Sequence, residues 1–185
     1  DGSTVSYTYD ANGQVLSATD QLGNVTSYTY DANGQMLTMT DPMGGVTTYT
    51  YDPCGSVASI STPLGLTTTY TYNSLNLVET VTDPGGHTTS YAYNAVGDVA
   101  SITDPMGGTM QYGYDLNGNV TSITNAEGHT TAYTYDALNR LSSVTDARGG
   151  KTVYEYDNEG RETGETDALS YTASKTYDGV GNLIS

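Results

Sequence analysis

The stretch that decides the fold is Val25-Thr-Ser-Tyr-Thr-Tyr30, then Asp31-Ala-Asn-Gly34, then Gln35-Met-Leu-Thr-Met-Thr40, then Asp41-Pro-Met-Gly44. Thr, Tyr and Val suit the pleated surface of a strand, and Tyr28 and Tyr30 share one face because they are two residues apart. Asn and Gly tolerate the positive φ of a tight turn, and Pro42 fixes φ at the second position of the other turn. The many Gly, Asn and Thr residues argue against helix. The stretch therefore predicts two antiparallel strands and two turns.

This unit recurs every 21 residues along the whole chain. A second Tyr stands two residues before each marker Tyr, and this pattern fails only at Lys175. We expect a single array of about nine repeats over residues 1–185, with both ends in mid-repeat. The marker residues, which we expect to form a structural ladder, are Tyr9, Tyr30, Tyr51, Tyr72, Tyr93, Tyr114, Tyr135, Tyr156 and Tyr177.

The returning strand of each repeat departs from simple alternation. Its apolar residues are three apart, as at Val57 and Ile60 or at Val99 and Ile102. In a regular strand, that spacing puts the two side chains on opposite faces. Either a β-bulge shifts the register or both faces of the sheet are partly covered, and we favour the bulge.

The motif resembles the Rhs or YD-repeat family, which includes bacterial polymorphic-toxin shells, insecticidal toxin-complex components, wall-associated proteins and teneurins. Within one copy, the match is carried by Tyr28, Tyr30, Asp31, Gly34, Met36, Thr40, Asp41, Pro42 and Gly44. The resemblance implies an all-β fold with one β-hairpin per repeat, the hairpins lying side by side in a twisted or spiralling antiparallel strip. In the family, the strip coils into a hollow shell that can enclose a passenger.

A second geometry also fits the period: a parallel β-solenoid with one 21-residue coil per strand spacing. Equivalent tyrosines would then lie directly over one another. In the hairpin strip, a returning strand separates them by roughly 10 Å. Two turn signals in each copy favour the hairpin.

Charge restricts the partners. The net charge is −16, which argues against nucleic acid and anionic membranes, because both need clustered Lys and Arg. Residues 1–139 carry 13 acids and no base, whereas residues 140–185 carry 8 acids and 5 bases. The family usually has Arg after the turn Gly. Here that Arg is kept at Arg140 and Arg161, and it is replaced by Gln14, Gln35, Ser56, Leu77, Asp98 and Asn119.

Tyrosine is the residue type in excess, with 18 copies and neither Phe nor Trp. We expect the tyrosines to be mostly buried between repeats, with hydroxyls pointing outward or hydrogen-bonded. Rows of Tyr can also stack on sugar rings, which makes carbohydrate an alternative partner. Asn24 and Asn119 begin Asn-Val-Thr sequons and are weak candidates for glycosylation.

The remaining polar residues point to no active site. The acidic turns lack the spacing of a calcium loop, so an Asx turn explains them and calcium is the alternative hypothesis. His87 and His129 are two repeats apart, and Cys54 has no base nearby in sequence. The Asp-Pro pairs, such as Asp41-Pro42, occupy the second turn. We expect no catalytic, cofactor-binding or metal-binding residue.

The sequence therefore predicts a non-catalytic structural scaffold, a segment of a secreted or cell-surface protein that forms an extended β-sheet wall or shell. The alternatives are a self-assembling extracellular filament, in which the repeats continue end to end, and a glycan-binding surface adhesin. The expected partners are further repeats of the same chain or of adjoining chains. No nucleic acid and no membrane insertion are expected.

Overall fold

The computed structural model describes residues 4–185, so Asp1-Gly-Ser, the start of the predicted array, lies outside the described residues. The chain divides into two compact units, Asp1–Ser90 and Tyr91–Ser185. The strands of the first unit are β1 (Ser6–Tyr9), β2 (Val15–Thr19), β3 (Val25–Tyr30), β4 (Met36–Thr40), β5 (Val46–Tyr51), β6 (Val57–Ser61), β7 (Thr67–Tyr72) and β8 (Val78–Thr82). β9 (Thr88–Tyr93) begins in the first unit and ends in the second.

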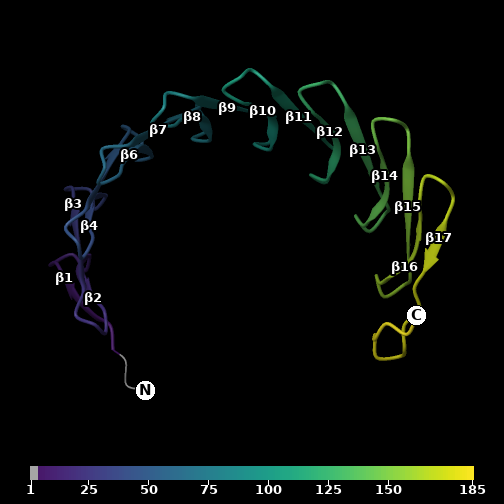
Figure 1. Cartoon of the computed structure of the whole chain (residues 1–185), viewed down its shortest axis with the longest axis horizontal. Helices are drawn as coiled ribbons and strands as arrows, with labels where there is room; N and C mark the ends of the chain where they lie inside the picture. The colour runs from purple at the N-terminus through teal and green to yellow at the C-terminus, as the bar shows by residue number, and fades with distance from the viewer. Residues whose placement is uncertain (1–3) are drawn as a thin grey trace. The chain divides into compact units, whose positions relative to one another are not determined.

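The strands of the second unit are β10 (Val99–Thr103), β11 (Thr109–Tyr114), β12 (Val120–Thr124), β13 (Thr130–Tyr135), β14 (Leu141–Thr145), β15 (Lys151–Tyr156), β16 (Glu162–Thr166) and β17 (Thr172–Ser174). Within each unit, every strand is antiparallel to the next strand along the chain, and Figure 1 shows successive hairpins side by side. This confirms the predicted all-β hairpin fold. Equivalent strands do not stack in parallel, so the solenoid alternative is wrong.

Both turns of a repeat have the same backbone hydrogen bonds. In the first turn, the Asp31 N–H donates to the Gln35 carbonyl at 2.9 Å, and the Gly34 N–H donates to the Asp31 carbonyl at 3.1 Å. In the second turn, Asp41 makes the equivalent pair with Gly45 and Gly44 at 2.9 and 3.0 Å. Gly34 has φ +86° and Gly44 has φ +84°. This is the three-residue hairpin loop that ends in a left-handed glycine.

The bulge is present in each first-turn hairpin whose register is known. Thr29 pairs with Thr38, but Tyr30 pairs with Met36, which leaves Leu37 as the extra residue. Met36 and Met39 therefore share a face with the tyrosines although they are three residues apart. The preferred interpretation of the three-residue spacing is confirmed. The same shift occurs at Tyr9, Tyr51, Tyr72, Tyr114, Tyr135 and Tyr156.

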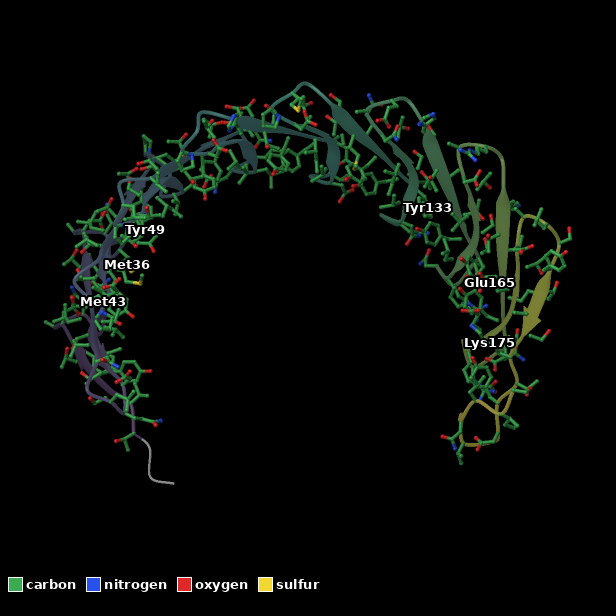
Figure 2. All side chains as sticks on the ribbon, in the orientation of Figure 1. Met36, Met43, Tyr49, Tyr133, Glu165 and Lys175 are labelled. Atoms are coloured by element: carbon green, nitrogen blue, oxygen red, sulfur yellow. The ribbon has the colours of Figure 1, made fainter. Side chains whose placement is uncertain are left out.

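The bulge gives each unit two chemically different faces. The tyrosine face carries the paired tyrosines and the two apolar residues of each returning strand; Figure 2 shows two of its residues, Met36 and Tyr49, on the same side of the ribbon. The hydroxyl face carries Thr and Ser, which bond across the hairpins: the side-chain oxygens of Thr29 and Thr38 are 2.6 Å apart. Equivalent bonds join Thr8 to Ser17, Thr50 to Ser59, Thr71 to Thr80 and Thr134 to Ser143.

Within residues 4–185, no hydrophobic side chain is buried, and the buried residues are Ser143, at 3% exposure, and Gly164. A single-layer sheet has no second layer to cover its faces, so side chains lose water only to their neighbours in the same layer. None of the tyrosines is fully buried. The expectation that they are mostly buried holds for the inner repeats, where neighbouring side chains cover most of each tyrosine, and it is wrong for the first strand, where Tyr7 and Tyr9 are 52% and 56% exposed.

Candidate functional site: the tyrosine face and its cross-repeat bonds

Seven of the marker tyrosines bond to the preceding repeat. The ladder between β2 and β3 ends at Ser17 and Ser27, and beyond it the Tyr30 hydroxyl donates to the Val15 carbonyl at 2.9 Å. That carbonyl precedes the bulge residue Leu16. The side chain thus continues the link between two hairpins where the backbone ladder has stopped. The same bond runs from Tyr51 to Met36, Tyr72 to Val57, Tyr114 to Val99, Tyr135 to Val120, Tyr156 to Leu141 and Tyr177 to Glu162, at 2.7–2.9 Å.

This environment raises the pKa of four of these tyrosine hydroxyls. Burial raises the pKa of Tyr51 and of Tyr72, and nearby carboxylates of the preceding turn add to the effect. Burial raises the pKa of Tyr114 and Tyr156 in the same way. A neutral hydroxyl is the form that can donate to a carbonyl, as the Tyr51 hydroxyl does to the Met36 carbonyl.

The carboxylate of the first residue in a turn accepts hydrogen bonds that stabilise the loop. Asp31 accepts hydrogen bonds from the backbone N–H groups of Asn33 and Gln35 on one oxygen, at 2.8 and 2.9 Å. This is the Asx-turn arrangement expected from the sequence. Such bonds favour the ionised form: the pKa of Asp20 is lowered chiefly by the Asn24 side chain, and that of Asp136 chiefly by the Arg140 backbone N–H.

The residue after the first-turn glycine or asparagine links one first turn to the next, and we call its place the clamp position. In two repeats of the first unit it holds glutamine: Gln14 Nε2 donates to the Gly34 carbonyl and Gln35 Nε2 to the Gly55 carbonyl, both at 3.0 Å. The sequence shows which residue stands there, but not what it contacts.

In the second unit, the clamp position holds arginine in two repeats. Arg140 Nε donates to Asp136 Oδ2 at 2.7 Å, and Nη1 donates to the Asp157 carbonyl at 3.0 Å. Its guanidinium lies 4.6 Å from the ring centroid of Tyr156, a cation–π distance. Arg161 repeats the arrangement with Asp157 at 2.6 Å and with the Tyr177 ring at 4.9 Å.

Two adjacent repeats carry charge on the tyrosine face. Glu162 and Glu165 stand where other copies have aliphatic residues, and Lys175 stands where they have the first Tyr. Lys175 Nζ donates to Glu162 Oε1 at 2.6 Å, and this bond raises the pKa of Lys175. Figure 2 labels Glu165 and Lys175 in this part of the second unit. The ion pair replaces apolar contact by charge pairing without changing the register.

The two sequon asparagines lie in turns and are engaged. The exposed Asn24 donates through Nδ2 to Asp20 at 2.8 Å. The half-buried Asn119 donates through Nδ2 to Asp115 at 2.9 Å and to Asn139 at 3.0 Å. Glycosylation of either residue stays a prediction.

The other polar candidates are dispersed. His87 Nδ1 lies 3.0 Å from Asp83 Oδ2, and His129 Nδ1 lies 3.9 Å from Glu127 Oε2. Cys54 is an exposed free thiol. Among residues 4–185, no three of His, Cys, Asp and Glu come together in a way that could hold a metal ion. The same residues form no helix of the length and apolarity needed to cross a bilayer.

Seven overlapping segments of the chain match the family model described as RHS Repeat: residues 9–42, 30–61, 55–88, 72–109, 93–130, 114–151 and 135–172. No curated protein sequence matches the chain.

Solved structures share the fold. The chain is 20% identical to a chain of the Photorhabdus luminescens Tc holotoxin pore, with a TM-score of 0.72 over 92% of this chain and 11% of that one. It is also 20% identical to a chain of TcdB2-TccC3 without its hypervariable C-terminal region, with a TM-score of 0.74 over 96% of this chain and 12% of that one. The chain thus spans only about a tenth of these larger polypeptides.

Proposed function

The chain belongs to the RHS repeat family, and from that premise we propose that it is a non-catalytic structural scaffold, one segment of a β-sheet wall or shell in a secreted or cell-surface protein. The observation that carries the proposal is the tyrosine bond between hairpins. Each hydroxyl joins its own repeat to the preceding one, so the same contact can extend the sheet by any number of copies.

The chemistry of the described residues supports a passive role. The carboxylates recur one per turn and hold their own loops, as Asp31 and Asp41 do, instead of converging on one reaction centre. We propose that the tyrosine ladder serves cohesion between repeats. Calcium and glycan chains at Asn24 or Asn119 are not needed for that role.

Electron microscopy of the full-length polypeptide that contains these repeats tests the proposal. A scaffold of this kind should appear as a thin wall around an enclosed volume, one sheet thick. Filaments that lengthen with protein concentration would instead support end-to-end continuation between copies. Separate compact particles with no continuous wall would contradict both versions.

Glycan binding is a second candidate, and the half-exposed tyrosine rings favour it. Their hydroxyls are engaged in bonds such as Tyr51 to Met36, but their ring faces remain partly open to solvent. An array of immobilised glycans incubated with the full chain would test this function. Retention on one sugar class that is lost on Tyr49→Ala, with the fold intact, would support it.

A further inference from the structure

A cavity of about 440 Å³ opens beside the first turn of the fifth repeat, within the second unit. Asp98, Tyr112, Tyr114 and Asp115 are among the residues that line it. Asp98 occupies the clamp position, where Arg140 stands two repeats later. The cavity therefore lies at a place that an arginine side chain fills elsewhere in the same unit.

The Arg140 repeat shows what this place can bind. There the guanidinium meets three groups: the Asp136 carboxylate, the Asp157 carbonyl and the face of the Tyr156 ring. The combination suits guanidinium, because a planar fork can pair with a carboxylate while its face stacks on an aromatic ring.

The junction of the fifth and sixth repeats keeps two of the three groups. Tyr114 is equivalent to Tyr156 and is held in place by its hydroxyl bond to the Val99 carbonyl at 2.8 Å. Asp115 is equivalent to Asp157 and presents the same turn carbonyl, which accepts the Gly118 N–H at 3.2 Å. The ring and the carbonyl are thus set as in the arginine repeat.

The third group, the carboxylate, is present but displaced. Asn94 stands where Asp136 stands in the arginine repeat, and the acid is at Asp98 itself. Asp98 Oδ2 accepts a hydrogen bond from Asn94 Nδ2 at 3.1 Å, while in the described part of the chain no group donates to Oδ1. The carboxylate is close enough to Tyr114 to add to the effect of burial in raising the pKa of that ring hydroxyl.

We propose that this cavity binds the guanidinium of an arginine side chain presented by a partner polypeptide. The partner supplies in trans the cation that Arg140 and Arg161 supply in cis. The guest pairs with the Asp98 carboxylate, stacks on the Tyr114 ring and donates to the Asp115 carbonyl. Arginine is the expected guest rather than lysine, because an ammonium offers no planar face for stacking.

The experiment titrates the full chain, carrying ¹³C-labelled tyrosine rings, with acetyl-Gly-Arg-Gly-amide and follows the ring resonances by NMR. The same peptides with citrulline and with lysine in place of arginine are the matched probes. The arginine peptide should shift the Tyr112 and Tyr114 resonances saturably. It should leave the resonance of Tyr135 unchanged, because the clamp residue of the repeat that precedes Tyr135 is the neutral Asn119.

Two variants and one control sharpen the result. Asp98→Asn should weaken arginine binding at least fivefold, and Asp98→Arg should abolish it while shifting Tyr114 without peptide. Glu127→Gln, which removes an exposed acid of the same unit outside the cavity, should leave binding unchanged. The unshifted Tyr135 and Tyr156 resonances report that each variant is folded.

Several results would overturn the proposal. They are no shift at Tyr114, equal binding by the citrulline or lysine peptide, equal binding by Asp98→Asn, and a uniform shift of all tyrosines. The last would mean a general attraction of cations to an acidic sheet.

Discussion

The β3–β4 hairpin of the first unit and the β13–β14 hairpin of the second have the same turns and the same bulge, but a different side chain at the clamp position. Gln35 makes one neutral hydrogen bond to the next turn, at the Gly55 carbonyl. Arg140 makes a charged bond to its own turn, a second bond to the next turn and a stacking contact with Tyr156. Cohesion between repeats can therefore vary along the array while the backbone does not.

Each repeat contains two sets of residues with different structural roles. Turn residues such as Asp31 and Gly34 specify the hairpin through bonds within a few residues. The clamp residue reaches the next hairpin through its side chain, and where it is arginine it also bonds to the carboxylate of its own turn. Changes at the clamp position should then alter the strength of a junction without altering the register.

The largest effect should come from acid, which acts together on the turns that begin with Asp. The pKa values of Asp20 and Asp83 in the first unit and of Asp136 and Asp146 in the second are lowered by turn hydrogen bonds. A lowered pKa means that the stabilisation is present above the ordinary carboxyl value of about 4 and is lost as the pH falls through the lowered value.

We therefore expect strand circular dichroism to be unchanged between pH 7 and pH 5 and to be lost below about pH 4. The Arg140 cation opposes protonation of Asp136, so amides of β13 and β14 should stay protected from exchange to lower pH than those of β3 and β4. Loss of both hairpins at one pH would show that the arginine adds nothing to its turn.

The next largest effect should follow truncation of a marker tyrosine. Tyr51→Ala and Tyr156→Ala each remove a half-buried ring and its bond to the preceding repeat, so each should cost about 2–3 kcal/mol, below the value for a fully buried ring. Tyr156→Ala should cost about 0.5–1 kcal/mol more, because Arg140 loses its stacking partner.

Hydrogen exchange of the flanking amides measures these costs, since repeat arrays open locally. Tyr156→Phe is the matched control: it keeps the ring, removes the hydroxyl and should cost about 1 kcal/mol. Equal free-energy costs for Tyr156→Ala and Tyr156→Phe would show that packing of the Tyr156 ring does not stabilise the junction between repeats.

A reciprocal swap at the clamp position tests the comparison directly. Arg140→Gln should cost about 1–2 kcal/mol at the junction of the two hairpins. Gln35→Arg should stabilise its junction by about 0.5–1 kcal/mol, because Asp31, the Tyr51 ring and the Asp52 carbonyl stand in the equivalent places. Chemical denaturation with local exchange as the readout should show opposite signs, and Gln35→Leu should lack the gain.

The smallest expected effect is on the turn that begins at Thr62, the second turn of its repeat. Thr62 stands where other repeats have Asp or Asn, and it accepts one backbone N–H, that of Leu66, at 3.3 Å. Asp146 in the second unit accepts two, from Arg148 and Gly150, both at 2.8 Å. Thr62→Asp should stabilise by about 0.5–1 kcal/mol and Asp146→Thr should destabilise by about the same amount, as judged from thermal melting. A destabilising Thr62→Asp would mean that charge repulsion in the base-free first unit exceeds the gain from the turn.

Several features of the fold could be predicted because they depend on neighbours in sequence. Asp31, Gly34, Asp41 and Gly44 mark both turns, and their spacing sets the length of each strand. The three-residue spacing of Met36 and Met39 indicated the bulge, since only an extra residue brings both onto the tyrosine face. The family resemblance followed from the same residues and is confirmed by the matching repeats.

The functional detail could not be predicted in the same way. The acceptor of the Tyr30 hydroxyl is a carbonyl 15 residues earlier, and it is open only because the ladder between β2 and β3 stops at Ser17. The half-buried state of the tyrosines depends on how many layers cover the sheet, which no pattern within a repeat reports. The sequence did contain a signal for the clamp position: the residue after the first-turn glycine or asparagine recurs every 21 residues but varies among Gln, Ser, Leu, Asp, Asn and Arg.

The sequence by itself thus determined the hairpin, its turns, its period and its family, because backbone preferences and Asx hydrogen bonds act over four or five residues. Only the tertiary structure decided which groups meet across repeats: Tyr114 with the Val99 carbonyl, Arg140 with Tyr156, and Asp98 with an open cavity. These contacts join residues 15 to 20 positions apart, and they exist only after neighbouring hairpins are laid in register.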